Sequence, residues 1–165
     1  MADLTNLETK LGEVTGLAMA AQAATEKVLK LAQQDGESQL EAKLQQMHDE
    51  AAETEQRCTE LSESFAGKKT AILDEARSTK AKGAEMMRTY LDDESDSLDG
   101  FEFLTMAEAG EVGHWSVLKA MNGDDAHAQV AELVGWALPI QQRHLSDVMT
   151  ASVNLAASED PDETA

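Results

Sequence analysis

Apolar residues recur at alternating spacings of three and four along almost the whole chain. One apolar stripe runs over residues 4–28, a second over residues 40–65, and a third over residues 72–90. This period places the apolar side chains on one face of an α-helix. The pattern therefore predicts long amphipathic helices that bury one face against each other.

Glycine-containing segments divide these stripes. Asp35-Gly36 predicts the end of the first helix, because glycine suits the left-handed position that follows a helix. Ala66-Gly67 interrupts the second pattern. We therefore expect two helices over residues 40–65 and 72–90, with one long helix as the alternative. The acidic segment LDDESDSLDG, residues 91–100, predicts a loop.

Two further helices are expected in the C-terminal half, over residues 101–121 and 126–156. The tight connection at 122–125 contains aspartates that suit capping of the following helix. Pro139 predicts a kink in the last helix. The short acidic tail, residues 158–165, is expected to be disordered.

The predicted fold class is therefore all-α. We expect a single domain over residues 1–157, an antiparallel four-helix bundle with an extra helix between the second and third bundle helices. The heptad-like spacing of residues 4–28 also permits an extended coiled coil. The short connection before the last helix favours the compact bundle.

Composition limits the partners of such a bundle. The formal net charge is −19, from 32 acidic against 13 basic residues. This field repels phosphate, so we expect neither nucleic acid nor an anionic membrane as a partner. The single cysteine, Cys58, excludes an intramolecular disulfide and is expected to be a small core residue. No signal peptide or membrane-spanning stretch is predicted, so cytoplasmic residence is expected.

Polar residues that fall inside the apolar stripes are the candidates for function. In residues 101–121, Leu104, Trp115 and Leu118 define the apolar face, and Glu111 falls within it. Glu108 and His114 lie on the two flanks of this face. A buried ionised carboxylate costs several kcal/mol unless it is paired or bound to metal. Glu111 is therefore expected to be buried and partnered.

The last helix carries a similar pair. Gln141 and His144, at i and i+3, lie inside the stripe formed by its apolar residues. Two helices that each present a carboxylate or amide with a histidine one turn later can converge on a cation. Carboxylate oxygen and imidazole nitrogen suit iron, manganese or zinc better than calcium or magnesium.

The N-terminal half contains candidate metal ligands in a less regular pattern. The string HDEAAETEQRC places His48 and Glu55 on one flank of its stripe and Glu50 on the other, while Glu53 points away. The first helix has no acid at a stripe position. Glu13 and Glu26 are its marginal candidates.

These motifs resemble those of ferritin-like di-metal bundles, which place Glu-x-x-His on two helices and single glutamates on the other two. Glu111-x-x-His114 matches this motif, and Gln141-x-x-His144 matches it with the glutamate replaced. Three segments resemble the bacterial stress-associated ferritin-like proteins over roughly residues 20–156. They are HDEAAETEQRCTEL, SFAGKKTAILDEARSTKAKGAEMM and EAGEVGHWSVLKAM. The family has a similar His/Glu-Thr-Glu helix, a Gly-Lys break and an extra helix before the third bundle helix.

The resemblance implies a metal-binding protein that acts in iron or manganese oxidation, storage or stress protection, and we expect a homo-oligomer. It implies ligand roles for Glu108, Glu111 and His144, and further roles for Glu26, Glu53, Glu55 and His114. Gln141 stands where the family motif has a glutamate and is included in the candidate metal site. Because Gln141 lacks the charge of a bridging glutamate, a lost or single-metal site is an open alternative.

Two interpretations from other classes stay open at this stage. In a metal-free helical scaffold, a neighbouring Gln, His or Arg satisfies Glu111, and a hydrogen-bonded pair of Gln141 and His144 fixes the helix register. The second interpretation, a coiled-coil component of a secretion or assembly system, is based on the polar N-terminal half of the chain. Gly67-Lys68-Lys69-Thr70 lacks the upstream glycine of a phosphate-binding loop, so nucleotide binding is excluded.

Overall fold

The computed structural model describes residues 3–163 and contains five helices in that range. They are α1 (Asn6–Asp35), α2 (Ser38–Ser62), α3 (Lys69–Tyr90), α4 (Ser97–Met121) and α5 (Ala128–Ala156). The protein is 81% helical, and no strand occurs among the described residues. The prediction of an all-α protein is confirmed.

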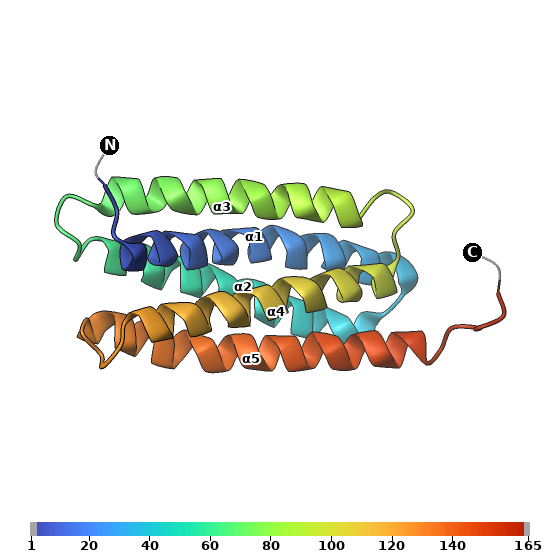
Figure 1. The fold of residues 1–165 in the computed structure, drawn as a ribbon. Coiled ribbons are helices and arrows are strands. Elements are labelled where there is room, and N and C mark those ends of the chain that lie inside the picture. The colour runs from blue at the N-terminus through green and yellow to red at the C-terminus, as the bar shows by residue number, and fades with distance from the viewer. Residues whose placement is uncertain (1–2, 164–165) are drawn as a thin grey trace.

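The helices lie side by side as an elongated bundle (Figure 1). Helix α1 packs against α2, α3 and α4, while α5 packs against α4 and α2. Sequential neighbours run antiparallel, so the return of the chain through α3 makes α4 run in the same direction as α2. Helix α3 contacts mainly α1, has few contacts with α2 and α4, and lies on the outside of the bundle.

Both predicted helix breaks are confirmed. Gly36 follows α1 in the left-handed region with φ of 77°, and its N–H donates to carbonyls of the last turn. Gly67 also has a positive φ, 72°, in the connection between α2 and α3. An L-residue at either position would be strained. The alternative of one long helix through residues 40–90 is wrong.

The predicted loop at residues 91–100 is too long, because α4 begins at Ser97. The Asp96 side chain accepts a hydrogen bond from the Asp99 N–H, and the Asp99 side chain accepts one from the Asp96 N–H. This reciprocal capping box satisfies two N–H groups at the start of the helix. The acidic residues that suggested a loop therefore begin a helix.

The predicted aspartate caps of the last helix are also wrong. Residue His127 precedes α5 and provides no side-chain cap. Asp124 and Asp125 adopt positive φ values of 45° and 53° in the turn. The side-chain amide of Asn122 instead makes two hydrogen bonds to the backbone of His127. Its nitrogen donates to the His127 carbonyl and its oxygen accepts from the His127 N–H, both at 3.0 Å.

The core consists of two apolar clusters with buried polar residues between them. The first apolar cluster includes Leu11, Val14, Cys58, Ile72, Trp115, Leu118, Val130 and Val134. The second apolar cluster includes Val28, Leu44, Met47, Phe101, Leu104 and Val148. The buried Glu108 and Glu111 fall between Leu104 and Trp115 on α4. The bundle therefore buries polar groups at mid-length, where a packed helical bundle ordinarily places apolar residues.

Two glycines allow α1 and α3 to approach closely. A Cβ atom added to Gly12 would lie 2.7 Å from the carbonyl oxygen of Ile72. A Cβ atom added to Gly16 would overlap the carbonyl oxygen of Ala76. Larger side chains at these positions would force α3 away from α1.

The remaining predictions about the chain concern its end and its relation to membranes. Residues 158–163 form exposed turns and bends, and residues 164–165 of the predicted disordered tail lie outside the described residues. Within residues 3–163, no helix combines the length and the apolar character needed to cross a bilayer.

Candidate functional site

Four polar side chains of α4 and α5 are buried at mid-bundle. The exposed fractions are 2% for Glu108, 3% for Glu111, 2% for Gln141 and 2% for His144. Each pair is spaced i, i+3, which puts both members on the same face of their helix. The predicted burial of Glu111 is confirmed.

Gln141 lies against both carboxylates of α4. One terminal atom of its side-chain amide is 3.0 Å from Glu108 Oε2 and 3.2 Å from Glu111 Oε2. With the amide nitrogen at this position, Gln141 donates a hydrogen bond to each acid. Gln141 therefore joins the two acids into one cluster.

His144 extends the cluster to α2. Its Nε2 lies 2.6 Å from Glu50 Oε2, and its Nδ1 lies 3.6 Å from Glu108 Oε2. Burial alone would lower the pKa of His144, but the hydrogen bonds and charges of Glu108 and Glu50 outweigh it and raise this pKa. The imidazolium form, which donates from both nitrogens, is therefore favoured between the two acids. We call Glu50, Glu108, Glu111, Gln141 and His144 the polar layer.

Glu50 was noted in the sequence only as a flanking residue, yet it completes the polar layer. The Arg143 guanidinium also pairs with its carboxylate. Burial tends to raise the pKa of Glu50, but hydrogen bonds from Gln46 and His144, with the positive charges of His144 and Arg143, lower it overall. Glu50 is therefore ionised next to His144.

Glu111 has a different environment. Burial, together with the charge of neighbouring Glu108, raises the pKa of Glu111 well above its ordinary value. The ion pairs among residues 3–163 include Glu108 with His144 and Glu13 with His114, but none to Glu111. Glu111 is thus the acid of the polar layer that lacks a positive partner.

The other residues suggested by the resemblance do not reach the polar layer. Glu53 is exposed and pairs with Arg57 on its own helix at 2.7 Å, because it lies roughly 120° around α2 from the buried Met47. The half-buried Glu55 accepts a hydrogen bond from Gln22 Nε2 of α1 at 2.5 Å. Among the described residues, the hydrogen bonds and ion pairs of these two glutamates include none to the polar layer.

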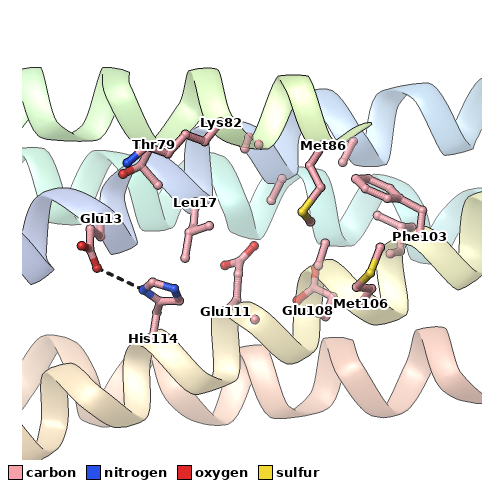
Figure 2. Close-up of a pocket in the computed structure, with 17 residues that line it drawn as sticks. Glu13, Leu17, Thr79, Lys82, Met86, Phe103, Met106, Glu108, Glu111 and His114 are labelled. Atoms are coloured by element: carbon pink, nitrogen blue, oxygen red, sulfur yellow. Dashed lines mark ion pairs between the residues drawn. The ribbon is translucent and has the colours of Figure 1, made fainter. Parts of the chain in front are cut away.

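A second polar cluster lies one turn further along α4. His114 Nδ1 is 3.2 Å from Glu13 Oε2 (Figure 2). The same nitrogen is 3.3 Å from Lys10 Nζ. The side chain of His114 is 39% exposed, so this cluster is partly solvated. Glu26, also implied by the resemblance, is exposed and pairs with Lys30. The Glu111-x-x-His114 motif therefore divides between two environments.

The polar layer contains side chains of the kinds that bind metal ions, but they do not surround a common point as the ligands of a bound ion do. As the side chains stand, the described residues contain no group of three or more His, Cys, Asp or Glu arranged to hold a metal ion. Glu108, Glu111 and His144 nevertheless share one layer with the amide of Gln141. Carboxylate, amide and imidazole are ligands that iron, manganese and zinc accept.

Comparison with known proteins gives no match to a family model, a curated protein or a solved structure.

Proposed function

We propose that this protein is a ferritin-like bundle that binds a single divalent transition-metal ion, iron or manganese, in the polar layer. Glu108, Glu111, Gln141 and His144 supply the ligands, and Glu50 orients His144. The role that follows is iron or manganese oxidation, storage or protection against metal-driven stress.

The contact of the Gln141 side-chain amide with the carboxylates of Glu108 and Glu111 is the main support for this proposal. The distances of 3.0 and 3.2 Å from its terminal atom to Glu108 and Glu111 resemble the spacing of adjacent ligands around one ion. Ligands about 2.1 Å from an octahedral ion lie about 3.0 Å from each other. A cation between the three groups would allow the amide oxygen to face the acids, whereas without it only the nitrogen suits that position.

The surroundings of His144 support the same assignment. Histidines that bind metals generally donate the second ring N–H to a carboxylate, which fixes the orientation of the ring. Glu50 occupies this position on Nε2, and Nδ1 faces Glu108. The two apolar clusters lie on either side of the layer, and the exposed fractions of Glu108, Glu111, Gln141 and His144 are only 2–3%.

The charge of the layer favours one ion. Glu108 and Glu111 together balance a divalent cation, and a neutral amide at position 141 adds no charge for a second ion. Bound iron or manganese would supply redox chemistry, while the chain supplies binding and orientation.

The order of the helices is also compatible with a ferritin-like bundle. Such bundles contain one long crossover connection between their second and third helices. Here α3 and its flanking loops make the connection between α2 and α4, which run in the same direction (Figure 1).

A metal-free scaffold is the alternative function, and one observation favours it. With the amide nitrogen of Gln141 facing the acids, both Glu108 and Glu111 accept a hydrogen bond, and His144 pairs with Glu50 and Glu108. The polar layer would then serve to fix the rotation of α2, α4 and α5 relative to each other.

Metal content distinguishes the two functions. Protein purified without a histidine tag would be exposed to manganous ion, or to ferrous ion without oxygen, then desalted and analysed by mass spectrometry. We expect retained metal in the wild type and in Glu53→Gln, which removes an exposed acid outside the layer, but not in Glu111→Gln. Equal retention in all three proteins, or none in any, would support the scaffold.

A further inference from the structure

An apolar groove lies beside the polar layer, and its apolar walls supply no ligand to the proposed metal site. It has a volume of about 360 Å³ and is lined by residues of α1, α3 and α4 (Figure 2). Helices α3 and α4 make few direct contacts with each other, which leaves this space between them. Its apolar walls include Leu17, Ala20, Met86, Phe103, Met106 and Ala107.

Acidic groups line the inner side of this groove. Glu108 and Glu111 both border it, and Glu13 lies at the end occupied by His114. Figure 2 shows Glu111 pointing from α4 toward Leu17. Of the basic groups on the lining, Lys82 is exposed and His114 is already paired with Glu13. The groove therefore combines apolar walls with a buried acid that has no positive partner.

We propose that the groove binds a primary alkylammonium ion, with its alkyl chain along the apolar walls and its ammonium group on the carboxylate of Glu111. This inference rests on the groove and on Glu111. Because Glu111 is also a ligand of the proposed metal ion, an ammonium ion and a metal ion would compete for its carboxylate, and the inference concerns the metal-free protein.

The charge of the lining selects a cation. An anionic ligand of similar shape, such as a fatty acid, would place its carboxylate next to Glu108 and Glu111 in a protein of net charge −19. An ammonium group instead provides three N–H donors and the positive charge that Glu111 lacks. Hydrogen bonds between charged groups are about twice as strong as neutral ones.

The apolar walls select a ligand with a hydrocarbon chain. Small-molecule pockets are mostly apolar, with a few polar groups that orient the ligand, and this groove is near the lower end of their usual size. The small residues Ala20, Ala107 and Gly83 are part of its lining. The exposed fraction of 38% for both Met86 and Met106 shows that the groove opens to solvent, through which a chain can enter.

The test uses metal-free protein, so that its outcome is separate from that of metal binding. Butylamine, hexylamine, 1-hexanol and hexanoate would be titrated at pH 8 by calorimetry, and the methionine methyl groups followed by NMR. Ala107→Leu fills the groove, and Ala109→Leu is its matched control, because Ala109 is exposed on the same helix and does not line the groove.

We expect hexylamine to bind and to shift the methyl signals of Met86 and Met106, but not that of Met149, which is exposed on α5 outside the groove. Each added methylene should tighten binding roughly fourfold. Hexanol should bind roughly tenfold more weakly than hexylamine, and Glu111→Gln should remove this difference. Ala107→Leu should weaken binding, whereas Ala109→Leu should not.

Three results would overturn the assignment. Absence of methyl shifts at Met86 and Met106 would show that the groove takes no such ligand. Equal binding of hexanol or hexanoate would show that Glu111 does not select a cation. An equal effect of Ala107→Leu and Ala109→Leu would place the ligand elsewhere. The comparison of the four ligands on the wild type requires no variant to fold.

Discussion

The imidazole Nε2 of His144 on α5 lies 2.6 Å from Oε2 of Glu50 on α2, although 94 positions separate the two residues in the chain. The ion pairs Lys43–Asp147 and Arg143–Glu50 also join α2 to α5. The contact connects the N-terminal helix pair to the C-terminal pair at the level of the polar layer. The rotation of α5 about its axis is therefore tied to that of α2.

Replacing His144 should produce a pH-dependent loss of stability. Glu108 and Glu50 raise the pKa of His144 in the folded protein above the unfolded value of about 6.5. The contribution of His144 is therefore complete below about pH 6.5 and is lost as the pH rises through the folded-state pKa. We expect His144→Gln to lower the free energy of unfolding by about 3 kcal/mol at pH 6 and by less at pH 9.

Urea unfolding of wild type and His144→Gln from pH 6 to 9 measures this difference. His48→Gln is the control, because His48 lies at the surface of α2 and outside the polar layer. A difference for His144→Gln that stays constant over this range would contradict the imidazolium assignment.

Neutralising Glu111 should stabilise the metal-free protein. Because burial and Glu108 raise the pKa of Glu111 in the folded state, the folded protein binds this proton more tightly than the unfolded chain. Stability is therefore lost as the pH rises from the unfolded pKa toward the folded one. We expect Glu111→Gln to raise the free energy of unfolding by about 1–3 kcal/mol at pH 7, with a smaller gain near pH 4.5.

Chemical denaturation in the presence of a chelator measures this gain. Glu102→Gln on the same helix removes an exposed acid and should change stability by less than about 0.5 kcal/mol. A destabilised Glu111→Gln at neutral pH would mean that the carboxylate has a positive partner that the structure lacks.

The contact of α1 with α3 should not tolerate an added methyl group. A Cβ atom at Gly16 would overlap the Ala76 carbonyl, whereas one at Gly113 on α4 would meet no atom within 4 Å. We expect Gly16→Ala to lower the free energy of unfolding by about 1–3 kcal/mol and Gly113→Ala to raise it by up to about 1 kcal/mol. Thermal melts compare the two, and stabilisation by both would show that α3 is free to shift.

A carboxylate at position 141 tests whether the site has lost a ligand. Gln141→Glu adds an acid next to Glu108 and Glu111, so it should destabilise the metal-free protein by a few kcal/mol. If the layer binds metal, the same change should increase the rise in melting midpoint caused by manganous or ferrous ion. A variant that is less stable, and whose melting midpoint does not rise when either metal ion is added, would show that the polar layer has only a structural role.

The period of the apolar residues was sufficient to predict the helices, because burial of one helix face requires that period whatever the partner. The start of α4 was missed because the acidic composition of residues 91–100 suggested a loop. Asp96 and Asp99 form a capping box, and their spacing was a local signal for a helix start.

The polar layer was predicted in part. Helical spacing alone placed Glu111, Gln141 and His144 in buried positions, because each falls within an apolar stripe. Glu50 was not selected, since its role depends on the height and rotation of α2 relative to α5, which no local pattern encodes. Glu53 and Glu55 came from the resemblance, and the rotation of α2 directs Glu53 to solvent and Glu55 to Gln22.

Titration of metal-free protein with manganous ion tests metal binding in the polar layer most directly, with the free ion followed by electron paramagnetic resonance. We expect wild type and Glu53→Gln to saturate at one ion per chain, and the double variant Glu108→Gln, Glu111→Gln to lose this binding. Weak uptake without saturation, equal in all three proteins, would show attraction by the acidic surface alone and would contradict a metal site.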